Sequence, residues 1–99
     1  MAMTTLKVPV HPGEILRYEF LEPMGLSPIR LAKHIRVPRT RIERLIKEET
    51  ALTIDTAKRL ARAFGTSVEF WMNLQMSYDL LKAEADIDVS LIEPLTAAQ

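Results

Sequence analysis

The sequence contains no cysteine in its 99 residues. This absence excludes disulfide bonds, thiolate nucleophiles and cysteine-based zinc sites. No apolar run approaches the ~20 residues that a membrane-spanning helix needs, and the opening MAMTTLKVPV lacks the apolar stretch of a signal peptide. We therefore expect a cytoplasmic protein that has no membrane segment.

Motifs for catalysis and for cofactor binding are also missing. The only histidines, His11 and His34, have no partner at metal-ligand spacing, and the sequence has no glycine-rich phosphate loop. Glu14 and Glu19 could be read as an acid pair, but no nucleophile accompanies them, so solvated helix charge explains them better. The sequence thus predicts a protein that is not an enzyme and that holds no metal, cofactor or small-molecule ligand.

Positive charge gathers in the middle of the chain, although the net charge is zero. Residues 27–62 contain ten Lys and Arg against four Asp and Glu, a net charge of +6, whereas residues 63–99 have one Lys against six acidic residues, a net charge of −5. A basic centre of this kind is typical of a segment that binds a polyanion. The simpler alternative is a helical domain whose charges are all solvated.

Hydrophobic residues make up 47% of the chain and recur at helical spacing, which predicts one all-α domain of five helices with short extended tails at both ends. Prolines and hydroxyl residues mark the helix starts at Pro12, Ser27 with Pro28, Pro38, Thr53 and Ser67. The first helix is expected to break within residues 22–26. We expect an extended N-terminal segment over residues 1–10, the helical domain over residues 11–85, and an extended or disordered tail over residues 86–99.

The second and third predicted helices have the spacing of a helix-turn-helix motif. Pro38 restricts Val37 to an extended conformation, so the second helix must end near Ile35 and the third begins at Pro38. The apolar pattern LAxxIxVxxxxIxxL fits the motif at six positions, which are Leu31, Ala32, Ile35, Val37, Ile42 and Leu45. In such motifs the helix after the turn enters the major groove of double-stranded DNA.

The third predicted helix divides its side chains between two faces. Ile42, Leu45 and Ile46 cluster on one side, and the opposite face is polar. The residues suited to reading bases are Arg39, Thr40, Glu43 and Arg44. The residues placed for phosphate contacts are Ser27, Arg30, Lys33, Arg36 and Lys47. Two roles stay open for Glu43, which either accepts a hydrogen bond from cytosine or holds a neighbouring basic side chain in place.

The fourth and fifth predicted helices supply apolar stripes. In the fourth, the stripe that repeats at helical spacing is Ile54, Ala57, Leu60, Ala61 and Phe64, followed by Gly65 as the C-terminal stop. In the fifth, the inward stripe is Phe70, Trp71, Leu74, Tyr78 and Leu81. A second stripe of Met72, Met76 and Leu80 lies on roughly the other side, and we expect it to form the contact of a homodimer. Core burial on both sides of this helix is the alternative.

Three segments carry a resemblance to a known family. HPGEIL, LAKHIRVPRTRI and LTIDTAKRLARAFGTSVEFWMNLQMSYDL, in this order, resemble the HigA/VapI antitoxins, which are XRE-type (lambda-repressor-like) helix-turn-helix proteins of bacterial type II toxin–antitoxin pairs. The resemblance covers about residues 11–82, and the run DTAKRLARAFGTSVEFWMNLQ is highly specific to that group. It implies a five-helix protein that dimerises, binds its own operator as an autorepressor and neutralises a RelE-like mRNA endonuclease.

One loop departs from this resemblance. Family members usually have an Asn-Gly-Lys-Arg-like loop after the recognition helix, whereas this chain has Lys47, Glu48, Glu49 and Thr50. Glutamates repel a phosphate backbone, so a protein-only toxin inhibitor with weakened DNA binding stays open as an alternative function. A stand-alone XRE-type transcription regulator without a toxin is the other alternative.

Overall fold

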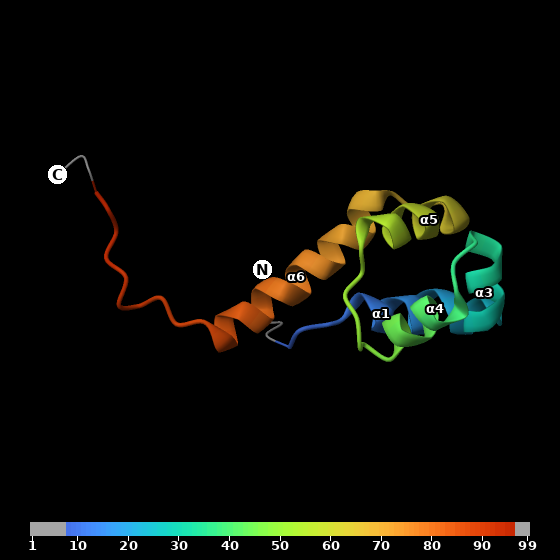
Figure 1. The fold of residues 1–99 in the computed structure, drawn as a ribbon, viewed down its shortest axis with the longest axis horizontal. Helices are drawn as coiled ribbons and strands as arrows, with labels where there is room; N and C mark the ends of the chain where they lie inside the picture. The colour runs from blue at the N-terminus through green and yellow to red at the C-terminus, as the bar shows by residue number, and fades with distance from the viewer. Residues whose placement is uncertain (1–7, 97–99) are drawn as a thin grey trace.

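The computed structural model describes residues 8–96, and all of the regular structure in this range is helical (Figure 1). The elements are α1 (Pro12–Ile15), the π-helical η2 (Leu16–Leu21), α2 (Glu22–Met24), α3 (Pro28–Ile35), α4 (Arg39–Ile46), α5 (Ile54–Phe64) and α6 (Val68–Asp86). The first three are consecutive parts of one helix, so residues 8–96 contain the five helices that the sequence predicts. Residues 8–10 are not helical. The rest of the predicted N-terminal segment, and residues 97–99 of the predicted tail, lie outside the described residues.

The first helix begins at the predicted residue and packs tightly on α4. The Nδ1 atom of His11 accepts a hydrogen bond from the Gly13 N–H at 2.9 Å, and Pro12 occupies the first helical position. A Cβ atom on Gly13 would lie 1.8 Å from the carbonyl oxygen of Leu45, so only glycine permits this approach of the two backbones. The His11 ring also packs edge-on against Tyr78, with 4.9 Å between the ring centroids.

The same helix does not end at Pro23, where a proline is expected to interrupt it, but two residues later. Over η2 the helix widens, and the Glu22 N–H bonds to the carbonyl of Arg17, five residues earlier. The helix then continues through Pro23, which has no N–H to donate. It stops at Gly25, whose φ of 60° is left-handed. The break therefore falls inside the predicted range, at the glycine rather than at the proline.

One hydrophobic core joins all five helices. Its completely buried large side chains are Leu16, Leu31, Ile42, Leu60 and Trp71. Burial of each such side chain stabilises the fold by roughly 2 kcal/mol. The Phe20 ring packs against those of Phe64 and Trp71, at centroid distances of 4.8 and 5.0 Å. The Nε1–H of Trp71 donates to the Thr66 hydroxyl at 2.7 Å, so the buried indole has its polar atom satisfied.

The buried stripe of α5 is shorter than predicted. Ala57, Leu60 and Ala61 are buried and Phe64 packs against the core, as expected. Ile54 was expected in the same stripe, but 62% of it is exposed. It is the first residue of α5, and helical side chains tilt toward the helix N-terminus. The Ile54 side chain therefore points past the N-terminal end of α5 and into solvent, and not onto the core.

Exposure rises along the predicted second stripe of α6. Met72 is partly buried and packs against the core, whereas Met76 and Leu80 are each 60% exposed. The difference follows from the position of α6, which starts beside α5 and then runs past the other helices (Figure 1). The N-terminal half of α6 is therefore covered on more sides than its C-terminal half. Beyond Asp86 the chain is not helical, and residues 87–96 are all exposed.

Candidate nucleic-acid interface

Backbone hydrogen bonds close the turn between α3 and α4. Arg36 has a left-handed φ of 64°, which lets the Val37 N–H donate to the carbonyl of Ala32 at 3.0 Å and the Arg36 N–H donate to that of Lys33 at 3.3 Å. This pair of bonds is the Schellman closure of a helix C-terminus. Pro38 then adopts an extended conformation and starts α4. The helix-turn-helix that the sequence spacing predicts is thus formed.

The side chains expected to contact phosphates lie on the surface around α3 and the end of α4. All five of these residues are exposed, namely Ser27, Arg30, Lys33, Arg36 and Lys47. The Ser27 hydroxyl oxygen accepts from the Arg30 N–H at 3.1 Å and so caps α3. Ser27 and Lys47 line one surface hollow, so the start of α3 and the end of α4 form a continuous edge.

The two faces of α4 separate as predicted. Ile42 and Leu45 are buried, while Thr40 and Arg44 are exposed on the other side. The Nε atom of exposed Arg39 lies 3.8 Å from the Oε2 atom of Glu43. Of the two roles left open for Glu43, this contact favours holding a basic neighbour in place.

The C-terminus of α4 ends in a left-handed residue that is not glycine. Glu48 has a φ of 63°, its N–H donates to the carbonyl of Leu45, and the Glu49 N–H donates to that of Arg44, both at 2.9 Å. This is again the Schellman pattern, whose left-handed position glycine prefers. The backbone therefore keeps the turn for which the related loops use glycine, with Glu48 in the strained position.

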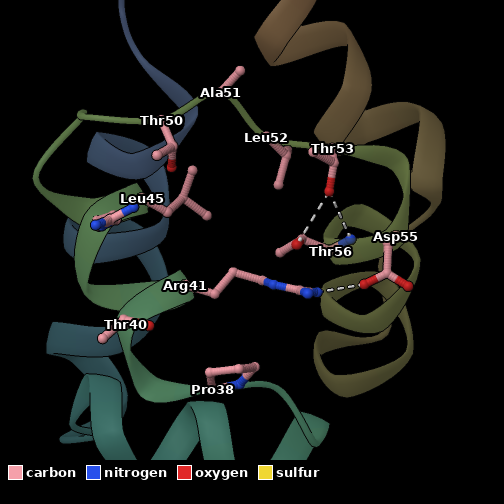
Figure 2. A pocket seen from close by; sticks show the side chains of 11 residues that line it. Pro38, Thr40, Arg41, Leu45, Thr50, Ala51, Leu52, Thr53, Asp55 and Thr56 are labelled. Atoms are coloured by element: carbon pink, nitrogen blue, oxygen red, sulfur yellow. Dashed lines mark hydrogen bonds and ion pairs between the residues drawn. The ribbon is translucent and has the colours of Figure 1, made fainter.

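An ion-pair network links α4 to α5 and α3. The Nη1 atom of Arg41 in α4 donates to the Oδ2 atom of Asp55 in α5, as Figure 2 shows. The Nε atom of Arg59 donates to the same oxygen at 3.1 Å, and its Nη1 atom donates to the Ile35 carbonyl at 2.8 Å. Hydrogen bonds from Arg41 and then Arg59 hold the pKa of the Asp55 carboxyl below its ordinary value.

Sequence reasoning did not assign Arg41, Asp55 or Arg59 a role. Asp55 and Arg59 are four residues apart on a predicted helix, which is a signal for an ion pair within α5. Arg41 is 14 residues from Asp55 in the chain, and no local pattern indicates their contact. Arg41 lines a surface pocket of about 410 Å³ between α4, the following loop and the start of α5 (Figure 2).

Residues 8–96 contain no cluster of three or more His, Asp or Glu side chains arranged to hold a metal ion. Within the same part of the chain, no helix has the length and apolar character needed to cross a membrane.

Comparison with known proteins places this geometry in a family. The helix-turn-helix family model (HTH_3) matches residues 18–71. Virulence-associated protein I of Dichelobacter nodosus is 48% identical over 88 residues, which are 88% of this chain and 82% of that protein. Antitoxin HigA-1 of Vibrio cholerae is 43% identical over 76 residues, which are 77% of this chain and 71% of the relative. The chain belongs to the HigA family of XRE-type helix-turn-helix proteins.

Solved structures of two antitoxins share most of this fold. The Pseudomonas aeruginosa antitoxin HigA with higBA promoter is 44% identical and has a TM-score of 0.82, covering 88% of this chain and 98% of that one. The antitoxin GraA in complex with its operator is 37% identical, also with a TM-score of 0.82, covering 89% and 92%. The HigA-family resemblance drawn from the sequence motifs is thus confirmed.

Proposed function

We propose that this protein is an antitoxin that binds operator DNA and represses its own transcription. The observation that carries the proposal is the division of α4, where Ile42 and Leu45 anchor the helix while Thr40 and Arg44 face outward. Arg39, Thr40, Glu43 and Arg44 are the proposed base-reading residues. Two of the related structures hold a promoter or an operator. The net charge of +6 over residues 27–62 supplies attraction to phosphates.

A gel-shift titration with DNA from upstream of the protein's own gene tests this function. We expect binding to that DNA in the nanomolar to micromolar range, with a logarithmic salt slope of about −0.9 for each phosphate contact. Random DNA of the same length should bind more weakly. A flat response to salt, or equal affinity for the two DNAs, would contradict operator binding.

We also propose that the protein acts as a homodimer through the C-terminal half of α6. One recognition helix contacts too few base pairs to select a site in a genome, so such motifs act in pairs about 34 Å apart, one turn of DNA. Met76 and Leu80 are exposed on α6, which is not one of the two helices of the helix-turn-helix. Met72 contributes only at the edge of this surface, because it packs against the core of its own chain.

Replacement of Met76 and Leu80 by Glu tests the dimer. The variant places like charges at the two-fold axis, so we expect a folded monomer with strongly reduced operator affinity. Tyr18→Glu, at another half-exposed apolar side chain, serves as the control and should leave the dimer intact. Light scattering that finds the double variant still dimeric would remove this surface from the proposal.

The proposed toxin partner is a RelE-like mRNA endonuclease, as expected from the resemblance and consistent with the antitoxin relative. Co-expression with the neighbouring gene, followed by affinity capture, tests it. Capture of that gene product and relief of its toxicity are expected. If no such partner exists and operator binding holds, the protein is a stand-alone regulator. If the toxin binds but DNA does not, it is a protein-only inhibitor, which the exposed Glu48 and Glu49 would favour.

A further inference from the structure

Arg41 lies at the rim of the face that α4 turns outward. On the helical wheel it falls between buried Leu45 and exposed Arg44, and its side chain is 41% exposed. It lines the same pocket as Thr40 and Arg44, which are proposed base-reading residues. A guanidinium carries five N–H donors, and the contact with Asp55 uses the Nη1 atom. Within residues 8–96 this is the one hydrogen bond of the Arg41 side chain, so its remaining donors can face a ligand at this rim.

Asp55 is the residue that fixes the direction of the Arg41 side chain. One carboxylate oxygen, Oδ2, accepts from both Arg41 and Arg59. Arg59 is itself held, because its Nη1 atom donates to the carbonyl of Ile35 at the end of α3. The orientation of Arg41 is therefore set by Asp55 and Arg59 on α5, and Arg59 is in turn held by the end of α3.

We propose that Asp55 is a positioning residue, and that Arg41, which it orients, is a further operator contact. The proposal rests on the operator binding proposed above and extends it to a residue outside the four proposed base-reading side chains. The partner is the DNA backbone or a base edge beside the groove, and both are bound well by a fixed planar guanidinium. An unfixed arginine would lose side-chain entropy on binding, and Asp55 removes that cost in advance.

The proposal makes a prediction opposite to that of simple charge repulsion. If Asp55 acts on DNA only as a nearby negative charge, its removal should strengthen binding to every DNA sequence. If Asp55 positions Arg41, its removal should weaken binding to the operator despite the more favourable net charge. The sign of the effect therefore separates the two roles.

The first experiment compares Asp55→Asn with the wild type on operator DNA and on random DNA. We expect operator affinity to fall about tenfold, which corresponds to the loss of one oriented contact, and random-DNA affinity to stay equal or to rise. Asp88→Asn is the control, because it also removes one exposed carboxylate that accepts a hydrogen bond, here from the Ser90 N–H at 2.9 Å, and Asp88 lies beyond α6, outside the helix-turn-helix. This control should leave operator affinity unchanged within about twofold.

A double-mutant cycle with Arg41→Ala links the effect to Arg41. Alone, Arg41→Ala should reduce operator affinity by at least as much as Asp55→Asn does. In the Arg41→Ala background, Asp55→Asn should no longer weaken binding. Equal or tighter operator binding by Asp55→Asn alone, or the same loss in both backgrounds, would overturn the positioning role.

The outcomes also separate this inference from the proposed function. A wild-type protein that does not distinguish operator from random DNA refutes both, whereas a wild type that does so and an unaffected Asp55→Asn refute only the inference. Thermal unfolding checks that the variants fold. If Asp55→Asn does not fold, Arg41→Lys replaces it, because lysine keeps the charge and lacks the planar fork. Unchanged operator affinity of Arg41→Lys would then overturn the inference.

Discussion

The side-chain carbonyl of Gln75 accepts a hydrogen bond from the backbone N–H of Leu52 at 2.7 Å, in the interior of the protein. Gln75 lies on α6 and is 6% exposed, and Leu52 lies in the loop that follows the recognition helix. The side-chain Nε2 atom of Gln75 also donates a hydrogen bond to the Asp79 carboxylate at 2.9 Å. A single buried amide thus ties the loop between α4 and α5 to the last helix.

Gln75→Leu should destabilise the fold by about 1–3 kcal/mol, because it leaves the buried Leu52 N–H without an acceptor. Urea unfolding followed by circular dichroism measures the change. Asn73→Leu, at an exposed position of the same helix, is the control and should change stability by less than about 0.5 kcal/mol. Equal stability of Gln75→Leu and the wild type would show that the loop has no need of this bond.

Glu48→Gly should stabilise the protein by about 1 kcal/mol. Glu48 has a φ of 63°, and a residue with a Cβ atom is strained in this region, whereas glycine is not. Glu49→Gly is the control, since no left-handed φ occurs at Glu49, and it should be neutral or destabilising. A loss of stability in Glu48→Gly would mean that the larger backbone freedom of glycine in the unfolded chain outweighs the strain.

Glu48→Gly combined with Glu49→Lys should tighten binding to DNA. The double variant removes two exposed negative charges from the end of α4 and adds a positive one, which attracts phosphates. It also restores the glycine and one basic residue that the related loops have. The gain should be larger at low salt. Unchanged affinity in gel shifts would place this loop away from the phosphate backbone.

Arg44→Ala should relax base preference at one position of each half-site and cost about 1–3 kcal/mol. Lys33→Ala should weaken binding to all sequences alike and make the salt slope shallower by about 1. Competition assays with operator variants and random DNA measure both effects. If each variant lost the same affinity on specific and on random DNA, the assignment of Arg44 to base reading would be wrong.

Protonation of Asp55 should weaken the fold only at low pH. Its carboxyl pKa is lowered from the ordinary 3.8 by hydrogen bonds from Arg41 first and then Arg59. The stability that this shift supplies is fully present above the unfolded pKa and is lost as pH falls through the lower folded pKa. The stability difference between wild type and Asp55→Asn should therefore stay constant from neutral pH to about pH 5 and narrow below about pH 4. A difference that narrows near neutral pH would contradict this origin.

Helix starts are the part of the fold that the sequence predicts best. Ser27, Thr53 and Ser67 all cap helices through side-chain oxygens, at the positions where the pattern predicts caps. Such caps act within one turn of the chain, so local sequence contains the whole signal. The buried pattern of the helix-turn-helix is equally local, because both helices present their apolar side chains across a turn of three residues.

Contacts between distant segments are the part that the sequence does not predict. How deeply Met72 is buried depends on how α6 packs on the core, which the periodicity of α6 does not contain. The link from Arg41 to Asp55 depends on the angle at which α4 and α5 pack. The first helix continues past Pro23, and its preceding turn, η2, is π-helical. The expectation that a proline ends a helix assumes regular α-helical geometry before it, and so predicts an end that is too early here.

Trp71 is the only tryptophan in the chain, and it is completely buried beside Phe20, with its Nε1–H bonded to Thr66. Tryptophan emission, excited selectively over that of the two tyrosines, therefore comes from one side chain and reports whether the core around it excludes water. Trp71 belongs to α6 and not to the recognition helix, so unfolding should shift its emission to longer wavelength while DNA leaves the wavelength unchanged. One optical signal can thus distinguish a variant that no longer folds from one that folds and no longer binds.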